Sequence, residues 1–336
     1  MDITNTNDFS GVNDLFEVFI SYRDNEEYIV SKNINNYNLY IFKLLDNEKI
    51  LTLKGHENHI TTIRYFINNN DNNEYLISAD IEGKVIVWDI TSNYDIKCKI
   101  DTCYSYNYGK SIIINSCLLI FPKFIDDNYN YDYIVTSTNY DSNNIDKSAS
   151  KIYLLKNGKY LKYIKETNKL KIFYLLYWYN KQDNKNYIIE FAFGKIVVNN
   201  LLLDELYTEF NQEYQSFQDC GFIYEKDCED YLCSSSTNGF INIWNLSYKF
   251  FFKSIYIIEG WLMHIIEWNN KYIIVTDLNN NLIKIIDLEK YEVIKDIQTK
   301  HKESVKSIKK IFHPIYGECL LSAGRDKAIK LWIIKN

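Results

Sequence analysis

Proline and glycine are scarce in this chain of 336 residues, which holds 2 prolines and 11 glycines. No stretch rich in Gly, Pro or Ser interrupts the sequence, so nothing in it resembles a flexible linker between two halves. A chain of this length can form one large domain or two ordinary ones. Without a linker, and with 46% apolar residues, the sequence predicts a single domain over residues 1–336 with a sizeable core.

Signals for secretion and for membrane insertion are also missing. Residues 1–7 hold no basic region followed by an apolar core, as a signal peptide would. No apolar run reaches the roughly 18–20 residues that a membrane-spanning helix needs. The seven cysteines contain no CxxC pair and no paired Cys/His spacing. We therefore expect reduced thiols, no metal site and an intracellular protein, cytoplasmic or nuclear.

An excess of positive charge is lacking as well, because the formal net charge is −6. This balance argues against nucleic acid or an acidic membrane as the general partner. One basic run departs from it, with six lysines within residues 156–171. The simpler interpretation is an exposed outer strand with solvated lysines, and the alternative is a patch that binds phosphate groups.

What the sequence does contain is a repeat of about forty residues. One copy runs from Gly55-His56 to Trp88-Asp89, another ends at Trp244-Asn245, and a third runs from His301 to Trp332. Each copy has a short β-rich run, a polar turn and an alternating run that ends in Trp, which is typical of half-buried strands. Such a unit is a small antiparallel sheet that cannot bury its own faces, so it must stack on its neighbours.

The Gly-His opening and the Trp-Asp ending, at this spacing, resemble the WD-repeat family. Weaker copies lie between the clear ones, with Phe42 and Asn199 where the Trp would stand. The resemblance implies an all-β fold, a seven-bladed β-propeller. Its blades are expected at approximately 15–55, 56–101, 110–166, 170–210, 213–256, 260–299 and 301–336.

The last expected blade has three strands before the chain ends, which would leave an open sheet edge. In the family the ring commonly closes with a strand from the other terminus. Residues 2–9 are the available donor, although their β character is poor. We expect them to complete the last blade.

In this family a His between blades, a Ser or Thr on the second strand, an Asp in the next turn and the Trp form a hydrogen-bonded chain. The resemblance carries all four roles to the last blade. They fall on His301, Ser322, Asp326 and Trp332. The second blade would keep His56, Ser78 and Trp88, with Glu82 at the turn. The fifth would keep Ser234, Asn238 and Trp244, with Glu213 at the place of the His.

A His, a Ser and an Asp also compose a hydrolytic triad. Here the Ser lies on an expected strand rather than on a sharp exposed turn, and the Trp would occupy its hydroxyl. The set also recurs in incomplete form in other blades, which a structural network tolerates. We interpret it as structural, and expect no catalytic residue and no cofactor.

The loops between blades and the turns after each second strand share one rim, which in this family most often receives protein partners. Trp261 is the sharpest candidate, since Trp and Arg are enriched in interface hot spots; a Trp buried between blades is the alternative. The rim candidates are Trp261, Arg325, His59, Asp80 and Lys302. We expect the long turn 139–150 to project from the same rim. It is either a binding element or an insertion without a function.

The sequence thus predicts a non-enzymatic scaffold or adaptor in a larger assembly, with protein partners on this rim. The alternative is a propeller that binds anionic lipid or nucleic acid through the lysines at 156–171. An enzyme would need a convergent cluster of acid, base or nucleophile, which the sequence does not offer.

Overall fold

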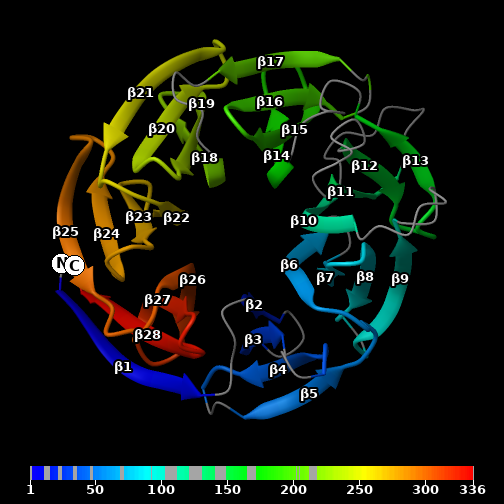
Figure 1. The fold of residues 1–336 in the computed structure, drawn as a ribbon, viewed down its shortest axis with the longest axis horizontal. Helices are drawn as coiled ribbons and strands as arrows, with labels where there is room; N and C mark the ends of the chain where they lie inside the picture. The colour runs from blue at the N-terminus through cyan, green and yellow to red at the C-terminus, as the bar shows by residue number, and fades with distance from the viewer. Residues whose placement is uncertain are drawn as a thin grey trace. The chain divides into compact units, whose positions relative to one another are not determined.

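The computed structural model describes residues 2–10, 16–21, 25–32, 36–45, 48–68, 72–91, 93–102, 112–120, 131–140, 149–164, 172–201, 203, 205–211 and 218–335. Within these ranges every regular element is a β-strand, and the strands form seven four-stranded sheets (Figure 1). This is the expected class, an all-β, seven-bladed β-propeller. The chain divides into two compact units, Met1–Lys54 with Asp219–Asn336, and Gly55–Gln218. The assignment of all residues to one domain stays a prediction.

The unit of residues 55–218 contains three sheets, each with its strands in chain order. The first consists of β6 (Ile60–Asn68), β7 (Asn73–Asp80), β8 (Lys84–Asp89) and β9 (Asp95–Asp101). The second consists of β10 (Ile112–Ile120), β11 (Tyr133–Tyr140), β12 (Ala149–Leu154) and β13 (Tyr160–Tyr163). The third consists of β14 (Ile172–Asn180), β15 (Lys185–Ala192), β16 (Lys195–Asn200) and β17 (Leu206–Asn211).

The other unit contains four sheets, three of them again in chain order. One consists of β2 (Phe16–Ile20), β3 (Glu27–Lys32), β4 (Leu39–Lys43) and β5 (Lys49–Leu53). The next consists of β18 (Gln218–Lys226), β19 (Glu229–Ser236), β20 (Phe240–Asn245) and β21 (Phe250–Tyr256). A third consists of β22 (Leu262–Trp268), β23 (Tyr272–Asp277), β24 (Leu282–Asp287) and β25 (Glu292–Gln298).

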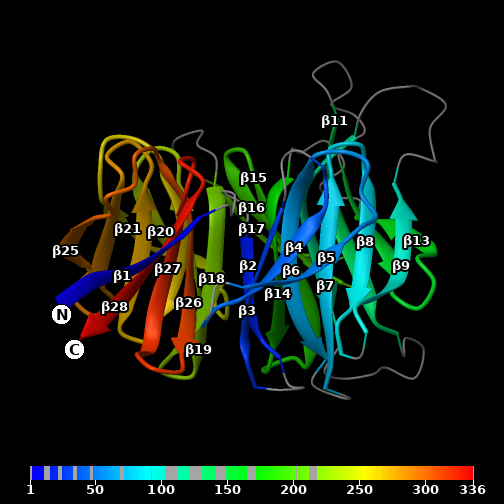
Figure 2. The ribbon, with the colours of Figure 1, turned by 90° about the horizontal axis from the view of Figure 1, so that it is seen from below.

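The last sheet is completed by the N-terminal strand. Its order is β1–β28–β27–β26, where β1 is Asp2–Ser10, β26 is Val305–His313, β27 is Gly317–Gly324 and β28 is Ala328–Lys335. β1 runs antiparallel to β28, from the pair Asp2 with Lys335 to the pair Ser10 with Ala328. Figure 2 shows the two strands side by side. The prediction that residues 2–9 supply this strand is confirmed.

Burial follows strand position within each sheet. The second and third strands, such as β7 and β8, are buried on both faces, whereas the fourth strand β9 buries only Cys98 and Ile100. The buried faces of adjacent sheets form shared apolar clusters; in one of them Val87 of β8 packs with Leu119 of β10. A fully buried aliphatic side chain contributes roughly 1.5–3 kcal/mol, so each sheet depends on its neighbour for much of its stability.

Arg64 connects three sheets of the unit of residues 55–218, and the sequence offered no sign of it. Its Nη1 donates to the carbonyl of Leu175 on β14 at 3.0 Å, and to that of Cys117 on β10 at 3.4 Å. The guanidinium carbon lies 4.4 Å from the centroid of the Tyr174 ring. One cation from β6 thus satisfies carbonyls on two other first strands and adds a cation–π contact.

Glu27, the first residue of β3, is a buried carboxyl group with 4% of its surface exposed. Among the described residues, neither of its carboxylate oxygens has a hydrogen-bond partner. Burial raises the pKa of Glu27 from 4.5 to about 7, and the nearby backbone N–H of Phe312, which does not reach hydrogen-bonding geometry, opposes this only in part. In the folded protein, the protonated form of Glu27 is therefore favoured below about pH 7.

Replacing Glu27 with Gln should stabilise the protein at pH 8 and have little effect at pH 5. Between pH 4.5 and about 7 the folded chain retains a proton that the unfolded chain releases. Stability therefore falls as the pH rises through this window, by roughly 1–3 kcal/mol, and the amide avoids the loss. Thermal melts at both pH values measure the difference. The neighbouring Glu26→Gln, at a partly exposed position, is the control. A lower melting temperature for Glu27→Gln at pH 8 would contradict the assignment.

Candidate functional site

The four residues expected to form a network in the last blade lie in contact. His301 Nδ1 lies 2.9 Å from Asp326 Oδ1, and its Nε2 lies 2.9 Å from Ser322 Oγ. The indole N–H of Trp332 donates to Ser322 Oγ at 2.8 Å. Because that oxygen accepts from the indole, its own proton is directed at Nε2 of the ring, and Nδ1–H then donates to the carboxylate.

Asp326 is held as an anion by several donors. Its oxygens accept from the backbone N–H of Lys302 at 2.8 Å and of Ala328 at 3.3 Å, besides the imidazole of His301. Partial burial acts to raise the pKa of Asp326, but these donors outweigh it and lower the pKa below its usual range. The carboxylate thereby joins the turn after β27 to the segment that precedes β26.

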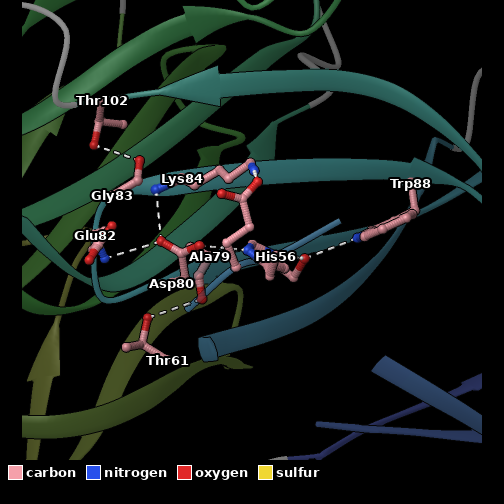
Figure 3. A network of polar contacts seen from close by, with 11 residues as sticks. His56, Thr61, Ala79, Asp80, Glu82, Gly83, Lys84, Trp88 and Thr102 are labelled. Atoms are coloured by element: carbon pink, nitrogen blue, oxygen red, sulfur yellow. Dashed lines mark hydrogen bonds and ion pairs between the residues drawn. The ribbon is translucent and has the colours of Figure 1, made fainter. Parts of the chain in front are cut away.

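The second blade contains the same chain of contacts with a different carboxylate (Figure 3). His56 Nε2 lies 2.7 Å from Ser78 Oγ, which accepts from the Trp88 indole at 3.0 Å. His56 Nδ1, however, lies 2.9 Å from Asp80 Oδ2, at the end of β7. The expectation that Glu82 takes this position is wrong. Its backbone N–H instead donates to Asp80 Oδ1 at 3.1 Å.

Asp80 was also a candidate for the exposed rim, and this too is corrected. Its surface is 0% exposed because the carboxylate points inward to His56 and caps the turn that follows β7. A carboxylate needs donors on all sides to be buried at this depth, and the imidazole and two backbone N–H groups supply them.

Gly324 explains how two different positions can supply the carboxylate. It lies two residues after Ser322, as Asp80 lies two residues after Ser78. A Cβ on Gly324 would lie 2.6 Å from Asp326 Oδ1 and 2.7 Å from the His301 Nδ1 atom. The space next to the imidazole therefore holds one carboxylate, which comes either from the end of the second strand or from the turn.

Two further blades show altered versions of this network. In the fifth, Ser234 and Trp244 are buried, and Glu213 lies outside the described residues. In the fourth, Glu190 and Asn199 occupy the places of the Ser and the Trp in the strand register, and the Asn199 amide donates to Glu190 at 2.8 Å. The sequence indicated the missing Trp at Asn199, but not the buried carboxylate of Glu190 that accepts from it.

The geometry of the last-blade network leaves no open position for a reacting group. Ser322 is buried, its oxygen accepts from Trp332 and its proton is directed at His301. A nucleophile needs an accessible oxygen and a base free to take its proton. We therefore keep the interpretation of these contacts as structural.

The other rim candidates lie in exposed segments between strands. Trp261, directly before β22, has 53% of its surface exposed, whereas the alternative was a buried side chain. Lys302 and Arg325 are exposed on the segment before β26 and on the turn after β27. In the unit of residues 55–218, His59 is exposed directly before β6.

One recurring hydrogen bond places these segments together. In three sheets the residue after the second strand donates its N–H to a carbonyl in the segment before the first strand of the same sheet. Leu278 donates to Trp261 at 3.1 Å, Arg325 to Ser304 at 3.0 Å, and Ile81 to His59 at 3.0 Å. In these three sheets the turn and the inter-blade segment therefore lie together at one end of the sheet.

Two glycines fix the segment that carries Trp261. The N–H groups of Ile257 and Ile258 donate to the Gly239 carbonyl at 2.9 and 3.4 Å, and a Cβ on Gly239 would collide with the carbonyl of Ile258. At the other end, Gly260 has a φ of +135°, and a Cβ there would collide with the Asn279 side chain. The segment is thus held at both ends, and Trp261 projects from a defined backbone.

Replacing Gly260 with Ala should loosen this segment at a cost of about 1–2 kcal/mol, because the backbone conformation disfavours a Cβ and Asn279 must move. Iodide quenching of Trp fluorescence would follow the exposed Trp261, and urea unfolding the stability. Gly317→Ala is the control, since Gly317 has a φ of +72° but open space around it. Equal quenching changes in both variants would contradict the role given to Gly260.

The rim of the last blade carries cations that are not neutralised. Lys302, Arg325 and Lys327 are exposed, and none of them has an ion-pair partner in the part of the chain that the structure describes. In the second blade, by contrast, Lys84 Nζ lies 2.9 Å from Glu57.

The lysines at 156–171 and the long turn 139–150, the two other candidate binding segments, are described only in part. Lys156 and Lys159 are exposed and Lys162 is half-buried, beside and on β13, while Lys165, Lys169 and Lys171 lie outside the described residues. Of the turn 139–150, residues 141–148 also lie outside them. Across the described ranges, no helix is long and apolar enough to cross a membrane.

Comparison with known proteins agrees with this architecture. Residues 47–89 and 294–332 match the family model for the WD domain, G-beta repeat. Each segment contains one complete set of His–Ser–Trp contacts. The first segment ends one residue after Trp88, and the second ends at Trp332. A search of curated protein sequences gives no match.

Solved structures share the fold at low identity. BBS1N, crystallised in complex with ARL6DN, is 12% identical with a TM-score of 0.73, and the match covers 99% of this chain and 97% of BBS1N. The β-propeller domain of Cps50 (Swd1) from Myceliophteria thermophila is 13% identical with a TM-score of 0.71, over 99% and 100% of the two chains. The fold and the repeats define a β-propeller. This chain is a seven-bladed β-propeller with WD repeats at residues 47–89 and 294–332.

Proposed function

We propose that this propeller is a non-enzymatic scaffold or adaptor that binds a protein partner at the rim of its sixth and seventh blades. The observation that carries the proposal is the exposed Trp261 next to a blade whose rim holds the unpaired cations Lys302 and Arg325. An aromatic anchor with neighbouring Arg is the composition typical of interface hot spots. The rigid backbone of residues 257–261 lowers the ordering cost of binding.

Two further observations support this role. BBS1N, which has a similar fold, was crystallised with ARL6DN as a partner. The described cysteines carry free thiols, and all but Cys228 are buried, which suits a reducing intracellular location, cytoplasmic or nuclear.

Affinity purification from native cells with quantitative mass spectrometry tests the proposal. Trp261→Ala and Arg325→Ala should each lose at least one partner that the unchanged protein retains, because truncating a hot-spot residue costs about 2 kcal/mol or more. Ile315→Ala is a matched control, since Ile315 is exposed at the other end of the same sheet as Arg325. If neither rim variant loses a partner, the choice of rim is wrong.

A further inference from the structure

The outer strand β21 carries an exposed aromatic surface. The side chains of Tyr248, Phe250, Phe251, Phe252 and Tyr256 are between 39% and 65% exposed. β21 pairs with β20 and is the last strand of its sheet, so its other edge lies at the outside of that sheet (Figure 1). Clustered apolar side chains on an exposed edge mark an interaction site.

Two other outer strands, β9 and β25, expose charged side chains. β9 exposes Asp95, Lys97, Lys99 and Asp101. β25 exposes Glu292 and Asp296, together with Val293 and Ile294. Charged side chains on an edge are the usual means of preventing contact with other chains. Within β21 itself the only charged residue is Lys253, and it begins with three consecutive exposed Phe residues.

Two ammonium groups converge beside this aromatic surface. Lys253 Nζ lies 4.3 Å from the centroid of the Tyr291 ring, and Lys226 Nζ lies 5.8 Å from it. The Phe252 ring is 6.0 Å from the same ring. Neither lysine forms an ion pair with any residue that the structure describes. Two like charges at one ring, next to exposed Phe side chains, constitute a place for an anion.

We infer that β21 and the Lys226–Lys253–Tyr291 cluster form a second docking surface, for an acidic protein segment with aromatic or aliphatic side chains beside its carboxylates. The apolar side chains of such a segment would cover Phe252, whose ring lies next to Tyr231 and Tyr291, and a carboxylate would neutralise the two ammonium groups. This surface is separate from the rim residues of the proposed function, so a scaffold could hold a different segment at each.

A second copy of the chain suits this surface poorly. A two-fold pair of copies joined at β21 would bring Lys253 and Lys226 of each copy to the same interface. Like charges that face each other across paired strands are destabilising. An acidic partner segment satisfies both the charge and the apolar area.

Fluorescein-labelled poly(Glu,Tyr), an acidic and aromatic random copolymer, can probe the surface on the full chain by fluorescence anisotropy. We expect binding that is tighter than for labelled polyglutamate. Lys226→Glu with Lys253→Glu should weaken it about tenfold or more, because each reversal replaces attraction with repulsion. Phe252→Ser should weaken it by about three- to tenfold through lost apolar contact. Lys97→Glu with Lys99→Glu on β9 is the matched control and should bind normally.

Two results would overturn the inference. The first is equal affinity for the variant with Lys226 and Lys253 reversed and for the β9 control, each with an unchanged thermal melt. The second is a dimer of the unchanged protein in sedimentation equilibrium that Phe252→Ser dissociates, which would identify a second copy as the occupant. Trp261→Ala separates this inference from the proposed function. If it alone abolishes copolymer binding, the rim binds the probe and β21 does not.

Discussion

Deleting residues 1–12 should lower the melting temperature by at least about 10 °C, because the last blade loses its fourth strand. β1 pairs with β28 at eight residue pairs, from Asp2 with Lys335 to Ser10 with Ala328. Without β1, one edge of β28 has no partner strand, and each lost hydrogen bond costs about 0.5–1.5 kcal/mol. The edge of an apolar cluster that contains Trp332 and Ile334 would be opened as well.

Thermal unfolding followed by circular dichroism measures this effect. A synthetic peptide of residues 2–10, added to the truncated chain, should restore part of the melting temperature, because the missing strand can pair in trans. A scrambled peptide of the same composition is the control. An unchanged melt after truncation would show that the pairing of β1 with β28 contributes little.

Replacing Asp80 with Ala should destabilise the protein by about 3–5 kcal/mol, since three buried or partly buried donors lose one acceptor. These donors are the imidazole Nδ1–H of His56 and the backbone N–H groups of Glu82 and Lys84. The loss would also release the link between the segment before β6 and the turn after β7. Urea unfolding measures the difference in free energy.

Glu82→Ala is the matched control for this experiment. Glu82 is exposed and lies in the turn position that carries Asp326 in the last blade. Its loss should change the free energy of unfolding by about 0.5 kcal/mol or less, as for an ordinary surface substitution. If Glu82→Ala costs as much as Asp80→Ala, the side chain of Glu82 rather than that of Asp80 sustains the network.

Much of the fold could be predicted because its signals are local. Alternation between apolar and polar residues identifies a half-buried strand within a few residues. The repeated Trp88, Trp244 and Trp332 then gave the length of the unit. Even the donor of the last strand was predictable, although residues 2–9 look little like a strand, because an open edge on β28 required one.

The candidate site was predicted less completely. Trp261, Lys302, Arg325 and His59 are exposed as the rim prediction requires, while Asp80 is buried. Arg64 was missed because a single Arg in an apolar strand gives no signal until the carbonyls of the neighbouring sheets are known. The aromatic surface of β21 was missed since its Phe residues look like core residues in sequence.

The sequence by itself determined the class of fold, the repeat and its motif residues, because each depends on patterns within one unit of about forty residues. The tertiary structure decided which carboxylate reaches each imidazole. Asp80 meets His56 from the end of a strand, whereas Asp326 meets His301 from a turn beside Gly324. It also decided that Trp261 is exposed while Trp244 is buried. These outcomes depend on how segments that are far apart in the chain contact and bury one another. Residue types and their spacing do not encode such contacts.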